Sequence, residues 1–514
     1  MIPRQGKGGR TIKHVLVIGA GMAGLSAAIR LRLAGYQVEI FEKEAMPGGK
    51  MHQIRMDGHV FDVGPTLVMM PAVYRDLFRL AGRDPEDYIP MTRLEPMYDV
   101  VFKGSPPRKY SIGSDLVSLM EIAEAKGPRN SAGFLSYLAE IYKRYQVAMA
   151  SFITRPFRGP GDIYTPHMLR QTMKLKTFDS ASNMMASFMP DEDLQRMFSF
   201  QTLYIGVSPH KGPSLYNIIP MIELLYGVWF IKGGMHTMAQ QTARLFEELG
   251  GRIHYKAEVD HILIREGRVA GLSVQGEEHA APYVVCNADF PYAITQLVQS
   301  PAARGKYTPE YVDKMDYACS CLIFYWGVTG SLEDMPAHTF IMSEDLDENL
   351  RCIFDGSPIP DPSIYLHIPS RVDPDMAPPG CSSLYVLLPV SELGVSKYAW
   401  DEERVGDYRA KALAALATLP GMAGFSAEQI RCEAVFTPRD FEERFHAYRG
   451  SCFGLQPTLR QSNHWRPQPK SMHCEGLYFT GSSIHPGAGV PIVIESGRLC
   501  AEELRRDEPE DPFK

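Results

Sequence analysis

The chain has 514 residues, of which 45% are hydrophobic and 22% are charged, and its formal net charge is −7. Single hydrophobic cores stop growing well below this length, so we expect two or three domains, and the composition is that of a globular protein rather than a disordered or fibrous one. The negative charge balance argues against nucleic acid as a partner.

All nine cysteines lie in the second half of the chain and form no Cys-x-x-Cys pair. This spacing suits neither a zinc site nor a secreted disulfide framework, so we expect reduced thiols and no metal.

The first 13 residues are basic and glycine-rich but lack the apolar segment of a secretory signal, and we interpret them as a flexible leader. The most apolar window, residues 215–231, is interrupted by Asn217, Pro220 and Glu223, so a spanning helix of ~20 apolar residues is not expected.

The first predicted element is a strand at residues 15–18, which ends at a glycine and leads into a helix at residues 22–34. A second strand is predicted at residues 37–42, and it completes a βαβ beginning. Residues 52–62 predict a hairpin with an Asp-Gly turn.

The glycines between the first strand and the helix, Gly19-x-Gly21-x-x-Gly24, form a dinucleotide-binding fingerprint, and Glu42 ends the next strand. Glycine lets the backbone approach a pyrophosphate at the helix N-terminus, and Glu42 is expected to accept hydrogen bonds from ribose hydroxyls. FAD and NAD share the ADP half, so the fingerprint alone does not separate them. The expected contacts are Val17, Ile18, Gly19, Ala20, Gly21, Met22, Ala23, Gly24, Glu42 and Lys43.

From residue 71 to about residue 177 the pattern is mostly helical. Alternating apolar runs then predict a sheet-based domain at residues 318–390. The other predicted elements are a helix that begins at residues 232–235, strands at 253–259, 262–264, 284–285 and 477–479, and a closing helix at 491–505.

These elements predict an α/β fold with α+β elements, in which a Rossmann-like domain is combined with a mixed-sheet substrate domain and a helical region. The Rossmann-like domain is discontinuous and takes in residues 12–75, 232–300 and 472–506. Residues 76–231 form the predicted helical region, and residues 301–471 form the predicted sheet domain.

Two further segments favour FAD over NAD. Gly48-Gly49-Lys50 resembles the second glycine pair of amine-oxidase-like flavoproteins, in which arginine more often fills the third position. Lys50 is still expected to place a positive charge near phosphate, as a point charge rather than a planar fork. Residues 476–481 and 485–491 look like the closing FAD motif of the phytoene-desaturase superfamily, where a helix N-terminus beside the flavin N1 and C2=O favours hydride acceptance.

Several colinear segments resemble one family. They are residues 61–66, 68–71, 200–206, 212–216, 218–223, 230–235, 288–291, 436–438 and 453–458. On these segments the chain resembles the dehydrosqualene (4,4'-diapophytoene) desaturases of the carotenoid (phytoene) desaturase family, over essentially everything after residue 13. The resemblance implies a Rossmann-like FAD-binding domain of the amine-oxidase/phytoene-desaturase type.

The same resemblance implies that FAD removes hydrogen from a C30 hydrocarbon, 4,4'-diapophytoene, in successive two-electron steps towards 4,4'-diaponeurosporene, in carotenoid biosynthesis. Hydride passes to flavin N5, and a proton passes to an acceptor for which Glu223 and His485 are the candidates. The further residues expected at the cofactor are Gly48, Gly49, Lys50, Gly64, Pro65, Thr66, Val259, Gly481, Ser482, Gly489, Val490, Pro491 and Ile492.

A hydrocarbon substrate offers no polar group, so apolar area at ~25 cal/mol per Å² must hold it in a tunnel, expected from residues 203–230 and 322–326. Because such a substrate resides in the bilayer, we expect a cytoplasmic protein that binds peripherally to the inner face of the cell membrane, through a helical membrane-associated region. The expected contact residues are Lys143, Arg144, Arg155, Arg158, Arg170, Lys174 and Lys176, with Phe152, Ile153, Phe157 and Met168.

Alternatives stay open. A C40 phytoene desaturase or a diapocarotenoid terminal-methyl oxidase shares this fold and these cofactor loops. A non-enzymatic prenyl-binding escort protein uses a related fold without a working FAD site, and an amine oxidase places an aromatic cage and a lysine near the flavin. Contact with other carotenoid-pathway enzymes, the number of desaturation steps, the terminal electron acceptor and the oligomeric state are also left open.

Overall fold

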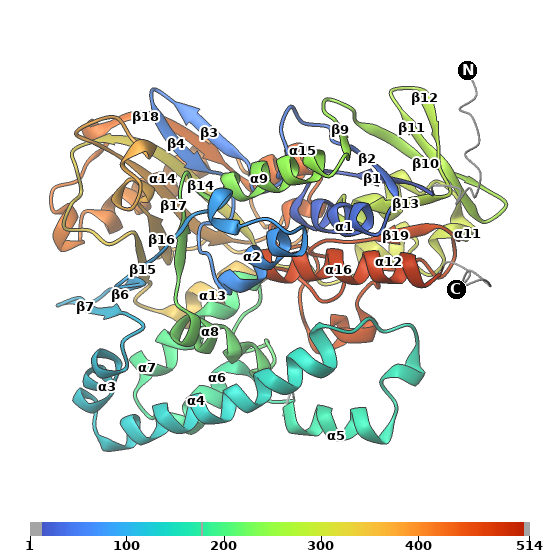
Figure 1. The fold of residues 1–514 in the computed structure, drawn as a ribbon. Coiled ribbons are helices and arrows are strands. Elements are labelled where there is room, and N and C mark those ends of the chain that lie inside the picture. Colours follow the sequence, from blue (N-terminus) through green and yellow to red (C-terminus); the bar gives the residue numbers. More distant parts are fainter. Residues whose placement is uncertain (1–12, 176–177, 508–514) are drawn as a thin grey trace.

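The computed structural model describes residues 13–175 and 178–507. The predicted leader lies outside these residues except for Lys13, and Lys176 of the predicted basic stretch also lies outside them. Figure 1 shows one sheet on the right, a second sheet on the left and a layer of helices below.

The first sheet has five parallel strands in the order β19-β13-β1-β2-β9. Its strands are β1 (His14–Ile18), β2 (Gln37–Phe41), β9 (Arg252–His254), β13 (Tyr283–Cys286) and β19 (Leu477–Phe479). Apart from their first residues, β1 and β13 are buried on both faces, which explains their unbroken apolar runs. The predicted βαβ beginning is confirmed, with α1 (Met22–Leu33) between β1 and β2.

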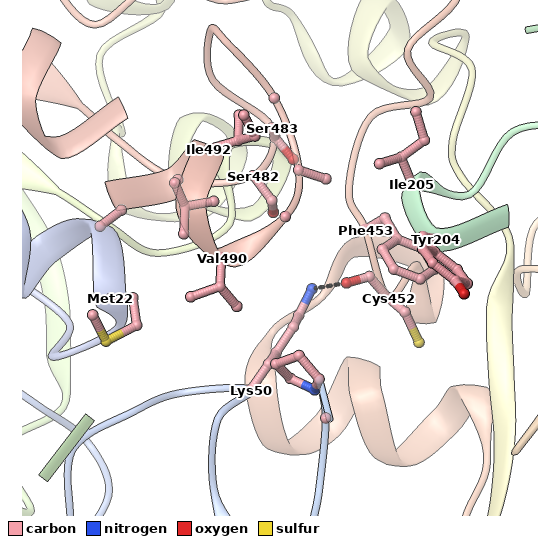
Figure 2. A pocket seen from close by; sticks show the side chains of 18 of the residues that line it. Met22, Lys50, Tyr204, Ile205, Cys452, Phe453, Ser482, Ser483, Val490 and Ile492 are labelled. Carbon is pink, nitrogen blue, oxygen red and sulfur yellow. Dashed lines mark hydrogen bonds between the residues drawn. The ribbon is translucent and has the colours of Figure 1, made fainter. Parts of the chain in front are cut away.

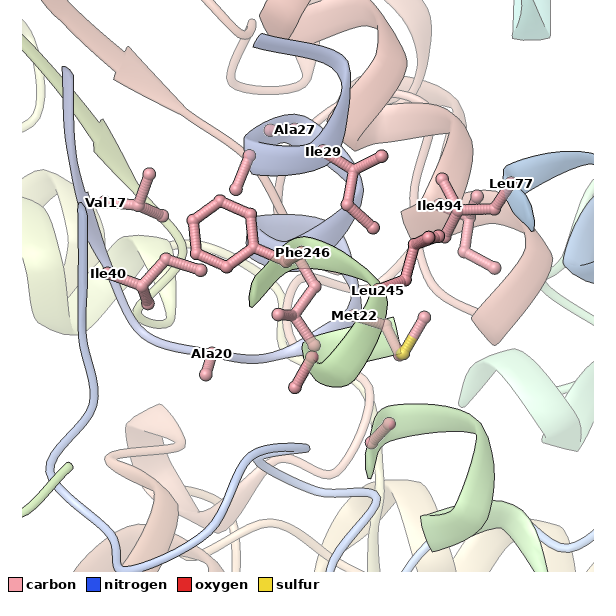
Figure 3. Packing of buried hydrophobic residues seen from close by; sticks show 14 of the residues in the cluster. Val17, Ala20, Met22, Ala27, Ile29, Ile40, Leu77, Leu245, Phe246 and Ile494 are labelled. Carbon is pink, nitrogen blue, oxygen red and sulfur yellow. The ribbon is translucent and has the colours of Figure 1, made fainter. Parts of the chain in front are cut away.

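Helices α1, α9 (Met235–Glu248) and α16 (Val490–Arg506) pack against this sheet. Figure 3 shows Val17 and Ile40 of the strands near Phe246 of α9. Helices α1 and α16 approach so closely that a Cβ atom at Gly497 would lie 2.5 Å from the Ala23 carbonyl oxygen. The closing helix, which the sequence predicted, therefore packs on the first helix of the chain.

The predicted strand at residues 253–259 is divided between β9 and β10, with a turn at residues 255–256 between them. β10 belongs to a separate antiparallel sheet with the order β10-β11-β12. Its strands are β10 (Val259–Arg265), β11 (Arg268–Val274) and β12 (Glu277–Ala280). The predicted hairpin is confirmed as β3 (Gln53–Met56) and β4 (His59–Asp62).

The second large sheet has seven strands in the order β18-β14-β17-β16-β15-β6-β7, and only the β15–β6 pair is parallel. Its strands are β6 (Tyr98–Phe102), β7 (Arg108–Ile112), β14 (Ser320–Thr329), β15 (His338–Met342), β16 (Ile364–His367), β17 (Cys381–Val390) and β18 (Ile430–Phe436). The predicted sheet at residues 318–390 is confirmed, since four of these strands lie in that range.

Most of the described residues from 71 to 175 are helical, as predicted, but the strands β6 and β7 within this range were not predicted. The run Tyr98–Phe102 is buried throughout and pairs with β15, so that Asp99 lies opposite Thr339, far away in the sequence. A short apolar run does not by itself distinguish a strand from a buried helix, and pairing with a distant strand decides the outcome. The predicted boundaries of the three regions stay predictions.

The helical layer below the sheets follows β7 in the chain. It comprises α3 (Leu116–Ala125), α4 (Pro128–Ala148), a π-helical turn (Met149–Ile153), α5 (Pro166–Leu175), α6 (Ala181–Phe188), α7 (Glu192–Met197) and α8 (Ile218–Tyr226). Across residues 13–175 and 178–507, no helix has the length and apolar character needed to cross a membrane.

The remaining elements connect these layers. They are α2 (Pro71–Leu80), β5 (Met91–Arg93), β8 (Trp229–Ile231), α10 (Phe290–Tyr292), α11 (Pro301–Arg304), α12 (Pro309–Asp313), α13 (Leu346–Asp355), α14 (Glu402–Leu416), α15 (Pro438–Phe445) and several short 3-10 turns.

Candidate active site

A cavity of about 620 Å³ joins the carboxyl ends of the five parallel strands to one face of the seven-stranded sheet. Its walls are of two kinds. Glycine-rich loops and helix N-termini line one part, and aliphatic and aromatic side chains line the other. The two predicted sites, for a dinucleotide and for an apolar substrate, therefore share one continuous cavity.

Most of the residues predicted to contact a cofactor line this cavity. They are Ile18, Gly19, Gly21, Met22, Ala23, Glu42, Lys43, Gly48, Gly49, Lys50, Gly64, Pro65, Thr66, Val259, Gly481, Ser482, Gly489, Val490, Pro491 and Ile492. Three predicted positions do not line it: Val17 and Ala20 belong to the hydrophobic core, and Gly24 lies inside the first turn of α1.

The fingerprint loop is held by Asn287, a residue that the sequence analysis missed. Asn287 follows β13, and its Oδ1 accepts a hydrogen bond from the Gly24 amide at 3.0 Å while its Nδ2 donates to the Thr480 carbonyl at 3.0 Å. A Cβ atom at Gly21 would lie 2.6 Å from this Oδ1, so only glycine fits there. Asn287 thus joins the ends of β1, β13 and β19. In the sequence, its position directly after a buried strand was the one signal that could have marked it as a site residue.

Glu42 lies at the end of β2 and is anchored by two backbone amides. Its Oε2 accepts a hydrogen bond from the Ala20 amide at 2.6 Å, and its Oε1 accepts one from the Glu44 amide at 3.0 Å. Burial raises the pKa of this carboxyl group above its ordinary value. Each oxygen keeps a lone pair beyond these bonds, so the group can still accept hydrogen bonds from a ligand in the cavity.

Lys50 lies in the cavity but is not directed at the fingerprint loop. Its Nζ donates to the carbonyl oxygens of Cys452 at 2.8 Å and Ser451 at 3.3 Å. Figure 2 shows the side chain reaching towards Cys452, with Val490 nearby. The sequence predicted a charge near phosphate, whereas here the ammonium is bound to a loop that follows α15.

The closing loop brings the N-terminus of α16 to the cavity. Gly481 and Gly489 have φ angles of +132° and +108°, which favour glycine, and Val490 begins the helix. The free amides of this first turn and the positive end of the helix dipole face a region where an anionic group would be stabilised.

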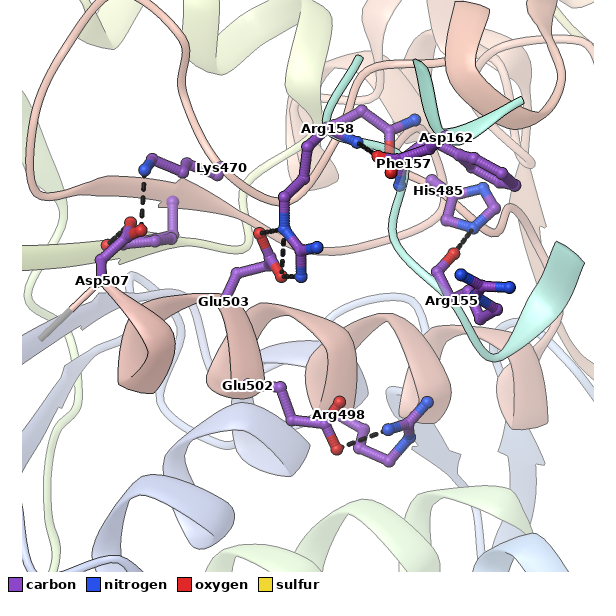
Figure 4. Close-up of polar contacts among 12 residues, drawn as sticks. Arg155, Phe157, Arg158, Asp162, Lys470, His485, Arg498, Glu502, Glu503 and Asp507 are labelled. Carbon is purple, nitrogen blue, oxygen red and sulfur yellow. Dashed lines mark hydrogen bonds and ion pairs between the residues drawn. The ribbon is translucent and has the colours of Figure 1, made fainter. Parts of the chain in front are cut away.

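His485 lies in this loop and lines the cavity. Its Nε2 is 2.9 Å from the Arg155 carbonyl oxygen, which can only accept, so Nε2 carries the proton (Figure 4). Burial lowers the pKa of the imidazole to about 4, so the ring is neutral at neutral pH. Its Nδ1 therefore holds a lone pair, and this buried atom has no hydrogen-bond partner in the described part of the chain.

Glu223 does not line the cavity but lies in a buried polar network beside it. Its Oε2 accepts hydrogen bonds from the Tyr98 hydroxyl at 2.8 Å and from Gln201 Nε2 at 3.4 Å, while its Oε1 has no hydrogen-bond partner among the described residues. Burial raises the pKa of this carboxyl group to about 7. The ring of Tyr204 lines the cavity beside this network.

An aromatic group forms part of the apolar wall. Phe340 lies at its centre, with ring centroids 4.7 Å from Phe200, 5.9 Å from Tyr204 and 4.8 Å from Tyr365. The predicted range 203–230 contributes Leu203, Tyr204, Ile205, Pro213, Leu215, Tyr216, Ile218, Ile219 and Ile222.

The predicted range 322–326 contributes only Ile323 to the cavity. Leu322, Phe324 and Trp326 belong to the core on the opposite face of the sheet. Side chains alternate between the two faces of a strand, so only every second residue of β14 can reach the cavity. Phe340, Tyr365 and Leu387 line the cavity from neighbouring strands and were not predicted.

The predicted membrane contact is wrong in three of its four apolar residues, since only Ile153 is partly exposed. Phe152, Phe157 and Met168 are buried in a small core beneath α4 and α5. The exposed apolar side chains of this region are instead Tyr164, Leu169, Met173 and Phe178, with 67%, 61%, 67% and 84% of their surface exposed. Helix α5 is amphipathic, and the sequence analysis chose a residue from its inward face.

Two of the predicted basic residues are also paired within the protein. Arg144 is buried and forms an ion pair with Glu140 at 3.1 Å, and Arg158 donates through Nε to Glu503 of α16 at 2.9 Å. Among the residues that the structure describes, no three His, Cys, Asp or Glu side chains are grouped so that they could hold a metal ion.

Comparison with known proteins gives matches to a family model, to relatives of known name and to solved structures. The model of the flavin containing amine oxidoreductase family matches residues 22–505. Two relatives, from Staphylococcus haemolyticus strain JCSC1435 and Staphylococcus aureus strain Newman, are named 4,4'-diapophytoene desaturase (4,4'-diaponeurosporene-forming). Each is 41% identical to this chain, over 96% of the chain and 99% of the relative.

Solved structures share the fold at low identity. Wild-type putrescine oxidase bound to putrescine matches with a TM-score of 0.61 and 15% identity, over 96% of this chain and 98% of that one. A CLA-producing fatty acid isomerase from P. acnes matches with a TM-score of 0.58 and 13% identity, over 96% of this chain and 98% of that one.

Proposed function

The chain belongs to the flavin-containing amine oxidoreductase family, and we propose that it is an FAD-dependent desaturase that converts 4,4'-diapophytoene towards 4,4'-diaponeurosporene in carotenoid biosynthesis. The observation that carries this proposal is one continuous cavity. A dinucleotide-binding loop lines one part of it, and apolar side chains line the other part. Relatives at 41% identity over nearly the whole chain support the C30 substrate.

The residues present fit FAD. At Gly48 and Gly64 a Cβ atom would lie 2.7 Å from the Met51 carbonyl and 2.2 Å from the Lys50 carbonyl, so glycine is needed for these loops of the cavity wall to pack as closely as they do. The residues that would hold the cofactor are the cavity-lining glycines of the fingerprint, Glu42 and Val259 at the adenosine end, and Gly481 to Ile492 at the ring. Bound FAD supplies a two-electron acceptor for hydride at its N5 atom.

The protein binds the substrate through apolar area. The tunnel wall from Phe200 to Ile222 and the aromatic group around Phe340 exclude water and hold a chain that has no polar group to orient it. The same wall leaves few groups near the reacting carbons that can take up a proton.

We favour His485 over Glu223 as the proton acceptor. When hydride leaves an allylic carbon, the remaining cation is strongly acidic, so a base with a pKa near 4 is strong enough to accept the adjacent proton. His485 lines the cavity, and its buried Nδ1 has no hydrogen-bond partner among the described residues, whereas the Glu223 carboxyl lies in the buried network next to Tyr204.

The outer face of α5 and its flanks is our proposed membrane contact, at the cytoplasmic face of the cell membrane. It consists of Tyr164, Leu169, Met173 and Phe178, with Arg170 and Lys174 on the same segment. Exposed apolar side chains beside basic ones suit an anionic bilayer surface, and the substrate resides in that bilayer. Contact with other carotenoid-pathway enzymes stays a prediction.

The test is product analysis with FAD-loaded protein and liposomes that contain one polyene at a time. With 4,4'-diapophytoene, the visible absorbance of a longer conjugated product should appear. Conversion of C40 phytoene in preference to the C30 substrate, or oxidation of terminal methyl groups, would assign the chain to one of the alternative activities. Protein that binds the polyene but holds no flavin would indicate a prenyl-binding escort.

A further inference from the structure

Arg466 is a buried guanidinium directly behind the closing loop. Only 1% of its surface is exposed. Its hydrogen bonds all go to backbone carbonyl oxygens. These belong to Ile484 at 3.3 Å, Gln461 at 3.1 Å, Leu455 at 3.0 Å and Ser482 at 2.6 Å.

No carboxylate within salt-bridge distance of this cation is found in the described part of the chain. The carboxylate that acts on it from further away is Asp289, whose two oxygens already accept hydrogen bonds from Ser483 at 2.7 Å and from the Tyr448 amide at 3.0 Å. Burying a cation without an ion pair is costly, and carbonyl dipoles offset only part of that cost. An anion on the far side of the loop would offset more of it.

A single layer of backbone separates Arg466 from the cavity. A Cβ atom at Gly487 would lie 3.9 Å from the Arg466 Cζ atom, and Ser482 and Ile484, whose carbonyls bind the guanidinium, both line the cavity. The positive charge therefore acts on the cavity through the thin loop, and it adds to the positive dipole end of α16.

We propose that Arg466 is a positioning residue that shapes the loop of residues 481–487 and, through that loop, stabilises the negative charge of the reduced flavin. This inference rests on the proposed FAD-dependent function. The planar fork fixes the carbonyls of Ser482 and Leu455 in one geometry, while the net charge raises the tendency of the flavin to accept a hydride from the substrate C–H bond.

The experiment compares FAD-loaded full-length wild type with Arg466→Lys, which keeps the charge, and Arg466→Met, which removes it. Arg460→Met, at an exposed position on the same segment, is the matched control. FAD content and thermal unfolding are measured first. Sulfite affinity and the two-electron potential are then measured, because sulfite adds to flavin N5 and leaves a negative charge on the ring, as reduction does.

We expect about tenfold weaker sulfite binding and a lower potential in Arg466→Met, since removal of a buried unit charge near a binding site changes an equilibrium by about this factor. Arg466→Lys should stay within a few-fold of wild type, and Arg460→Met should be unchanged. Normal sulfite affinity in a folded, FAD-loaded Arg466→Met would overturn the inference. If that variant does not fold, a tenfold loss in Arg466→Lys overturns it. Wild type without flavin would instead refute the proposed function.

Discussion

The Nε2 atom of His485 donates a hydrogen bond to the carbonyl oxygen of Arg155 across 2.9 Å, and this contact joins the closing loop to the segment that follows the π-helical turn. Figure 4 shows that segment beside α16, where Arg158 meets Glu503. Because the contact fixes the proton on Nε2, the lone pair of the neutral ring lies on Nδ1.

His485→Gln tests the proposed proton acceptor. The glutamine amide can still donate to the Arg155 carbonyl, but it places no basic nitrogen where Nδ1 lies. We expect kcat to fall by about 10²-fold or more, with FAD content unchanged and KM within a few-fold, because proton transfer by a positioned group contributes about this much. A kcat within about threefold of wild type would exclude His485 from this role.

Glu223→Gln tests the raised pKa of the buried carboxyl group through the pH dependence of the free energy of unfolding. Its pKa is about 7 in the folded protein against 4.5 when exposed, so the unfolded chain releases the proton first. The free energy of unfolding should therefore fall as pH rises from about 4.5 through 7, by up to about 3 kcal/mol. Relative to wild type, Glu223→Gln should gain stability over this range in denaturant titrations.

The same variant also compares the two proton-acceptor candidates. Because Glu223 does not line the cavity, its replacement should reduce kcat far less than His485→Gln does. A larger loss in Glu223→Gln, with folding and FAD content intact, would move the proton-acceptor role to the network of Glu223 and Tyr204.

More of the residues predicted for the cofactor than of those predicted for the substrate line the cavity. The fingerprint glycines and Glu42 are recognisable because their motif is defined by residues close together in the sequence. Phe340 and Tyr365 reach the cavity only because β15 and β16 pair in the second sheet, and no local pattern encodes that pairing. Phe152 and Phe157 were assigned to the surface because helical spacing alone does not say which face a neighbouring element covers.

Asn287→Ala tests the support of the fingerprint loop. The variant removes two hydrogen bonds that hold the Gly24 amide and the Thr480 carbonyl together. Each such buried bond contributes about 1 kcal/mol, so we expect FAD affinity to fall about tenfold, measured by fluorescence titration of the apoprotein. Unchanged affinity would show that the glycine loop keeps its shape without this side chain.

The membrane contact is tested by the double variant Leu169→Ser/Met173→Ser on the exposed face of α5. Binding to anionic liposomes in cosedimentation should drop several-fold, while desaturation of detergent-solubilised substrate should change little. The matched control is Leu33→Ser/Leu80→Ser, which removes two exposed leucines from α1 and α2. Equal loss in both double variants would place the contact elsewhere.

The most direct test of FAD-dependent desaturation is anaerobic single turnover. Purified FAD-loaded protein is mixed with liposomes that contain 4,4'-diapophytoene, and the absorbance of the oxidised flavin is followed together with that of the polyene. We predict that the flavin absorbance is lost in a one-to-one ratio with the new double bonds formed. Protein that holds no flavin, or a flavin that stays oxidised while the substrate is bound, would contradict the account.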